Sequence, residues 1–147
     1  MNTEKEIIKL KYQIKLLKFM VNGDKFPFFM YALDHEFEES QVNALLKILS
    51  VFKYRLSKST DNSYDSSNQL YELIKEDESL DSLLQTYQIE TSDIYKTELP
   101  SISEFKQYCN CIFANKEINL RYLLMNLKRQ SIHGKLCDYL LKQLGGE

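Results

Sequence analysis

The sequence predicts an all-α fold, a compact helical bundle of about six to seven helices that opens with a long amphipathic, coiled-coil-like helix. Its 147 residues include four glycines and two prolines, too few for a fold built from many tight turns. Thr3 with Glu6, and Ser101 with Glu104, have the spacing of helix-capping boxes. Apolar residues recur every three or four positions along 39–56, as on a helix buried on one side: Val42, Leu45, Leu46, Leu49, Phe52 and Leu56.

The first helix, expected near Glu4 to Val21, carries a heptad pattern. β-Branched residues at a and leucines at d favour a parallel two-stranded coiled coil, so the sequence predicts a homodimer. Charge supports parallel pairing weakly, through Glu6 near Lys11 of the other chain, and antiparallel pairing stays open. The expected interface consists of Ile7, Leu10, Ile14, Leu17 and Val21.

A second apolar stripe runs along the opposite side of the same helix. With two faces to bury, the helix is expected to pack one on its own domain and the other on a partner. The alternative is a monomeric bundle in which its own chain buries both faces. The second stripe consists of Ile8, Tyr12, Leu16 and Phe19.

The remaining elements follow in one domain, 1–147. A short helix from Pro27 to about Glu36 precedes the helix at 39–56. A polar, mobile loop is expected at 57–68. It opens an acidic insertion at about 57–103, with short helices near 70–74 and 80–87 and an irregular segment at 91–100. Three helices close the chain, beginning near Ser101, Asn119 and Ser131, with Tyr122, Leu123 and Leu127 buried.

The composition indicates a cytoplasmic protein. The apolar runs are far shorter than the roughly 20 residues that span a bilayer, and no secretory signal is recognisable. Cys109, Cys111 and Cys137 are an odd number without a disulfide pattern, which suits free thiols in a reducing compartment.

No catalytic or cofactor motif is recognisable, so the sequence predicts a non-enzymatic protein without a cofactor, a metal site or a small-molecule substrate. His35 and His133 are the only side chains with an ordinary pKa near neutrality, and neither has a relay partner at a suitable spacing. The chain lacks the spacing of zinc and calcium sites and the glycine-rich loops that cradle phosphate.

Nucleic-acid binding is the alternative function. Residues 120–130, the turn at 131–134 and the helix beyond have the order of a helix-turn-helix. The last helix offers few side chains that read base edges, and the formal net charge of −2 disfavours phosphate binding. The candidate phosphate contacts are Arg121, Lys128, Arg129, Lys135 and Lys142.

Several segments resemble the YhaI-like family, small all-α proteins of Gram-positive bacteria without an assigned function. They are the opening IIKLKYQIKLLKFMV, the corner at Phe26, Pro27 and Phe28, HEFEESQVNALLKIL, and EFKQYCNCIF followed by LLMNLKRQSIHGKLCDYLL. The sequence departs from the family at Glu38, where a Ser or Thr cap is usual, and in the longer segment 57–103. The resemblance implies an α-helical, self-associating protein and no particular activity.

Together these patterns predict a helical protein–protein interaction module. We expect a homodimer that binds another protein and regulates or inhibits it, of the kind that phages and mobile elements encode. The DNA-binding dimer with basic C-terminal helices stays open as the alternative.

Overall fold

The structure, a computed structural model, describes residues 2–21, 24–60, 78–94, 96, 98–114 and 116–145. The described residues form eight helices and no strand, which confirms the all-α class. The helix count exceeds the predicted six to seven, partly because Thr91–Ile94, expected to be irregular, forms one helical turn.

The helices lie close to their predicted positions. The bounds are α1 Thr3–Met20, α2 Pro27–Asp34, α3 Glu39–Thr60, α5 Glu78–Thr86, α6 Thr91–Ile94, α7 Ile102–Ile112, α8 Leu120–Arg129 and α9 Gly134–Gly145. The predicted loop at 57–68 begins too early, since α3 continues to Thr60. The rest of that loop and the helix expected near 70–74 lie outside the described residues.

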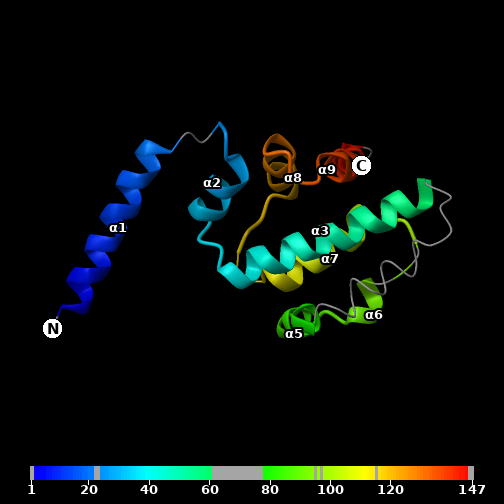
Figure 1. Cartoon of the computed structure of the whole chain (residues 1–147), viewed down its shortest axis with the longest axis horizontal. Helices are drawn as coiled ribbons and strands as arrows, with labels where there is room; N and C mark the ends of the chain where they lie inside the picture. Colours follow the sequence, from blue (N-terminus) through cyan, green and yellow to red (C-terminus); the bar gives the residue numbers. More distant parts are fainter. Residues whose placement is uncertain are drawn as a thin grey trace.

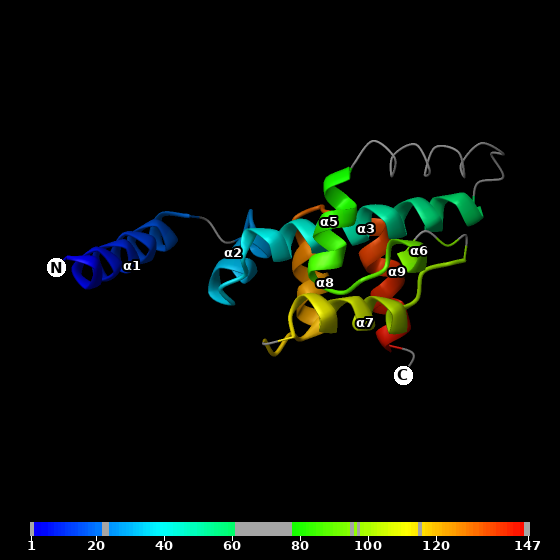
Figure 2. The same cartoon turned by 90° about the horizontal axis from the view of Figure 1, so that it is seen from below.

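Helix α3 is the centre of the body, in contact with α5, α6, α7 and α9 (Figure 1). Helices α8 and α9 pack on each other as a helical hairpin around the turn at 130–133, and α2 packs on α8. Helix α1 projects away from all of them, with the N-terminus at its far end, in both Figure 1 and Figure 2. The body therefore comprises α2 to α9, and α1 is an arm joined to it beside α2.

The core forms around the apolar stripe of α3, where Leu45, Leu49 and Phe52 are fully buried as predicted. Segment 78–94 contributes to it as well, so part of the expected acidic insertion is integral to the body. Tyr122 was expected to be buried and is exposed, because α8 turns its other side inward. Other core residues are Phe28, Ile48, Leu84, Ile94, Phe105, Ile112, Leu123, Leu124, Leu127, Leu136 and Leu140.

One ion pair lies inside this core. Arg55 of α3 is 1% exposed, and its guanidinium donates to both carboxylate oxygens of Glu104 at 2.7 and 2.9 Å. It also donates to the carbonyls of Glu98 (2.8 Å) and Ile94 (3.3 Å), and the Tyr108 hydroxyl donates to Glu104 at 3.0 Å. The pair therefore joins α3, α6, α7 and the segment between α6 and α7.

Side-chain caps begin two helices as the sequence predicts. Ser101 accepts from the Glu104 N–H (3.1 Å), and Asn119 accepts from the Tyr122 N–H (3.1 Å). The predicted capping box at Thr3 is wrong: α1 already includes Thr3, and Asn2 is its N-cap residue without a side-chain bond.

Three helices end without the glycine that usually accepts a left-handed conformation. Glu36, Gln88 and Ser131 have φ of 56°, 59° and 62° after α2, α5 and α8. In each case the next N–H bonds five residues back, as in Phe37 to Ala32 (2.9 Å), which is the Schellman arrangement. An apolar residue follows each left-handed residue and packs on the body, and this contact offsets the backbone strain: Phe37, Ile89 and Ile132.

We expect Arg55→Leu to destabilise the protein by about 3–5 kcal/mol, because it leaves the Glu104 carboxylate without its cation in a mostly buried site. Urea unfolding followed by circular dichroism measures the loss. Lys53→Leu, on an exposed part of the same helix, is the matched control and should change stability by about 0.5 kcal/mol or less. Equal effects of the two substitutions would show that the ion pair does not stabilise the fold.

Candidate protein-docking surface

Helix α1 has no buried residue over its 18 positions. All five residues of the predicted seam, Ile7 to Val21, are 42–57% exposed. The second stripe is exposed too, with Phe19 at 77%. The expectation that α1 packs one face on its own domain is therefore wrong, and so is the alternative in which its own chain buries both.

A helix whose apolar stripes are exposed to solvent lacks the packing contacts that stabilise most helices in proteins. Isolated helices shorter than about 12–15 residues are marginal in water, and α1 is only slightly longer. Burying one Leu or Ile side chain fully contributes roughly 1.5–3 kcal/mol. The exposed side chains of α1 could thus contribute several times that amount if another surface covered them.

The seam continues onto α2. Ile14 and Leu17 of α1 and the C-cap residue Val21 line a groove of about 400 Å³ together with residues of α2 and the segment before it: Phe26, Phe29, Met30 and Leu33. Phe26 and Phe29 stack with ring centroids 6.1 Å apart, and both rings are about half exposed. We call the predicted seam of α1 together with these residues the amino-terminal apolar surface.

Sequence reasoning did not assign the α2 side of this surface to an interface, although three phenylalanines, Phe26, Phe28 and Phe29, surround Pro27. Only Phe28 of the three is buried. The available signal was the spacing of Phe26, Phe29 and Leu33, three and four apart, which places them on one side of α2.

Two polar contacts hold α2 in place. The Lys18 ammonium donates to Asp34 at 2.7 Å, joining α1 to the end of α2. The Gln130 side-chain oxygen accepts from the backbone N–H groups of Phe28 (2.8 Å) and Phe29 (3.1 Å). Gln130 lies in the α8–α9 turn, so the C-terminal hairpin caps the first turn of α2 and orients one wall of the groove.

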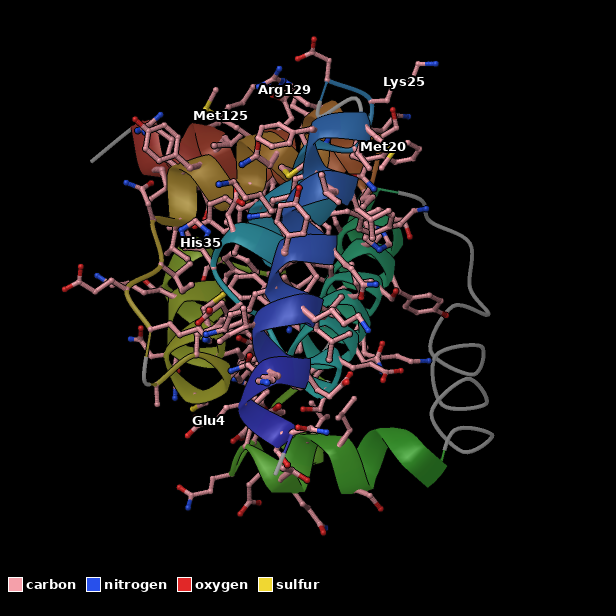
Figure 3. The ribbon with its side chains drawn as sticks, turned by 90° about the vertical axis from the view of Figure 1, so that its left-hand side faces the viewer. Glu4, Met20, Lys25, His35, Met125 and Arg129 are labelled. Carbon is pink, nitrogen blue, oxygen red and sulfur yellow. The ribbon has the colours of Figure 1, made fainter. Side chains whose placement is uncertain are left out.

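Side chains of α1 extend in all directions around its axis (Figure 3). Glu4 and Met20 lie at opposite ends of α1 in this view. The groove is at the end that carries Met20, and Ile7 and Leu10 in the first turns do not line it.

The five basic residues of the DNA-binding alternative are all exposed on α8 and α9. Two of them share one carboxylate: Lys128 lies 2.8 Å and Lys142 3.7 Å from Asp138. The hydrogen bond from Lys128 lowers the pKa of Asp138 below its ordinary value, so this carboxylate stays charged. Arg129 lines a surface hollow beside Asp24 and Asp34. Acidic groups thus interrupt the basic surface.

The two histidines do not form a catalytic site. His35 is exposed and stacks on Tyr31 with ring centroids 4.0 Å apart. His133 Nε2 lies 3.5 Å from the Ser50 hydroxyl, which donates instead to the Leu46 carbonyl at 3.0 Å. Burial, helped by Lys53, lowers the pKa of His133, so the imidazole is neutral at pH 7 but does not polarise this serine.

Two of the three cysteines lie in surroundings that disfavour the thiolate. Cys109 and Cys137 are buried, Cys111 is half-buried, and all three are free thiols. Burial raises the pKa of Cys137 to about 12 and that of Cys109 further, so neither is a thiolate nucleophile at neutral pH.

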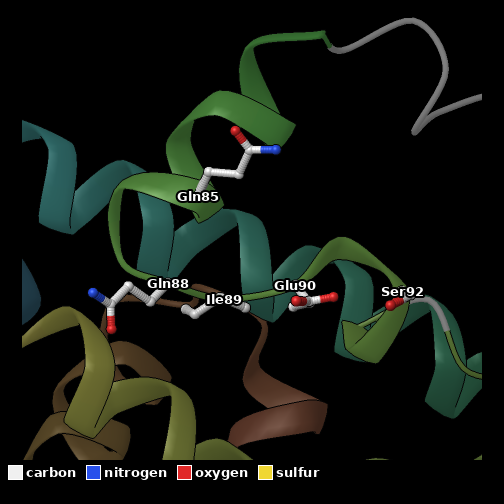
Figure 4. A pocket seen from close by; sticks show the side chains of 5 residues that line it. All are labelled: Gln85, Gln88, Ile89, Glu90 and Ser92. Atoms are coloured by element: carbon white, nitrogen blue, oxygen red, sulfur yellow. The ribbon is translucent and has the colours of Figure 1, made fainter.

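A second hollow lies where α5 connects to α6, lined by Gln85, Gln88, Ile89, Glu90 and Ser92 (Figure 4). Gln85 lies on α5, away from the others, and Gln88 and Ser92 are at opposite ends of the connection. A nucleophile, a base and an orienting group do not converge here.

In the described part of the chain, no group of three or more His, Cys, Asp or Glu side chains could hold a metal ion. No helix there is both long and apolar enough to cross a bilayer.

We expect Gln130→Leu to loosen the first turn of α2, because the N–H groups of Phe28 and Phe29 lose their acceptor. Amide hydrogen exchange at these two positions should quicken, with a stability loss of about 1–2 kcal/mol. Gln143→Leu is the matched control: Gln143 accepts from the Ile102 N–H at 2.6 Å and so caps α7 instead. If both variants leave exchange at Phe28 and Phe29 unchanged, Gln130 does not position α2.

Comparison with protein-family models, with curated proteins and with solved structures finds no match for this chain. The resemblance to the YhaI-like family therefore stays a prediction.

Proposed function

We propose that this protein is a non-enzymatic interaction module, a homodimer formed through the amino-terminal apolar surface that binds another protein and regulates or inhibits it. The observation that carries the proposal is an 18-residue helix with exposed apolar residues on both sides and no buried side chain. A soluble helix of this composition gains its stability from a partner.

The seam suits a second copy of the chain. Its residues repeat at a and d positions, the pattern by which two identical helices pack knobs into holes. The groove against α2 extends this seam by four more apolar residues, Phe26, Phe29, Met30 and Leu33. An isologous pair would cover the same surface on both subunits.

The second stripe suits the regulated protein. Ile8, Tyr12 and Phe19 are 61–77% exposed and lie outside the seam and the groove. In a homodimer they stay uncovered and present aromatic and aliphatic side chains, which are typical of docking residues at interfaces. We place this activity in the cytoplasm, because the three free thiols suit a reducing compartment. A YhaI-like relationship would fit the self-association.

Sedimentation equilibrium over a range of concentrations tests the homodimer. We expect a dimer for the wild type and a folded monomer for Ile14→Asp, because a charge in the seam loses its hydration when the helices pair. Circular dichroism should show that the body keeps its helices, since no residue of α1 contributes to the core.

Tyr12→Asp is the matched control, on the same helix but on the side away from the seam. It should remain a dimer. A wild type that is monomeric throughout the concentration range, or equal dissociation of both variants, would contradict a dimer formed through the seam.

DNA binding remains the second candidate, favoured by one observation: α8 and α9 form a hairpin around a four-residue turn and expose five cations. We expect no retained complex with duplex DNA in a gel shift at physiological salt, because Asp138 pairs with Lys128 and Lys142 and offsets part of their charge. A tight complex whose affinity falls steeply with salt and weakens in Arg121→Ala with Lys135→Ala would favour the DNA-binding function instead.

A further inference from the structure

We infer that the two copies of α1 pair antiparallel, with the first turns of each α1 seated in the groove between α1 and α2 of the other subunit. This inference rests on the proposed homodimer and specifies its geometry. Ile7 would lie opposite Leu17 of the partner subunit, and Leu10 opposite Ile14 of the partner subunit, as a and d residues do in antiparallel pairs.

The first argument is the uneven distribution of apolar surface along α1. Ile14, Leu17 and Val21 share a groove with α2, whereas Ile7 and Leu10 lie beyond it. Each subunit thus has a groove without an occupant at one end and an apolar stripe without a groove at the other. An antiparallel pair joins the two in both directions, which satisfies the two-fold symmetry of a dimer.

The second argument is the position of α2. Because Phe26, Phe29 and Leu33 line the groove with the last turns of α1, α2 lies beside the seam at that end. A parallel pair would bring both α2 helices, and the bodies beyond them, to the same end of the pair. It would also leave Ile7 and Leu10 covered only by their own copies. The antiparallel pair separates the bodies and covers each end with three helices.

Charge is complementary in the same direction. The first turn of α1 carries Glu4 and Glu6, and its last turn carries Lys18, which lines the groove. Antiparallel pairing brings Glu4 near Lys18 of the partner subunit. It also places the positive end of each helix dipole beside the negative end of the other. The antiparallel pair also places Lys11 near Lys11 of the partner subunit at the two-fold axis, which is repulsive. A parallel pair would instead form an ion pair between Glu6 and Lys11 of the partner subunit. Such exposed pairs contribute little, so the coverage of apolar surface decides.

Disulfide trapping between full-length chains distinguishes the arrangements. A disulfide requires Cα atoms within about 7 Å, and ten helical residues span about 15 Å, so each cysteine pair reports one orientation. We would prepare Ile7→Cys and Leu17→Cys, each with Cys111→Ser, and oxidise them singly and mixed in a glutathione buffer. Cys109 and Cys137 are buried and do not compete. Tyr12→Cys on the outer side is the control.

We expect a cross-linked dimer only in the mixture of Ile7→Cys and Leu17→Cys, at least tenfold more abundant than in either variant alone or in the control. Cross-linking of each variant with itself would establish parallel pairing and overturn the inference, while the homodimer stands. A dimer that forms no disulfide, either in the mixture or in the single variants, would overturn the inference as well. A monomer in sedimentation would overturn the proposed homodimer together with this geometry.

Discussion

The body of this protein depends on a charge that its core encloses. Arg55 is fully buried among Phe52, α6 and α7, and the guanidinium lies 5.2 Å from the Phe52 ring centroid. Removing such a group from water is expensive, and only a bidentate carboxylate with additional carbonyl acceptors compensates for it. Glu104 and the carbonyls of Glu98 and Ile94 provide both. Their positions relative to α3 are therefore strongly constrained. Burial, together with the neighbouring Glu104 carboxylate, raises the pKa of the Tyr108 hydroxyl that donates to Glu104.

Three glutamine side chains form hydrogen bonds to backbone groups at the ends of the surrounding helices. Gln41 accepts from the Glu38 N–H and donates to the Ile112 carbonyl, which joins the start of α3 to the end of α7. Gln130 and Gln143 cap α2 and α7 from positions 102 and 41 residues away. Each of these bonds satisfies a helix terminus that would otherwise lack a partner. Gln130 thus orients the α2 wall of the groove beside α1.

Local patterns predicted most of the helices, and long-range contacts explain what they missed. The caps at Ser101 and Asn119 involve residues three apart, so the sequence displays them directly. The seam of α1 was recognised by its period, but its exposure to solvent was not, because burial depends on how α1 lies relative to the body. Sequence patterns did not single out Arg55, since its partner is 49 positions away. Nor could spacing show that Gln130 caps α2.

The long-range cap on α2 has a consequence for synthesis on the ribosome. The seam of α1 precedes α2 in the chain, whereas the wall that α2 contributes is held by Gln130, about 100 residues further along. A nascent chain therefore presents its arm well before its groove is oriented. If the arms pair as proposed, neighbouring chains on one messenger could meet through α1 first, and the later folding of α8 and α9 would then fix α2 beside the partner's arm.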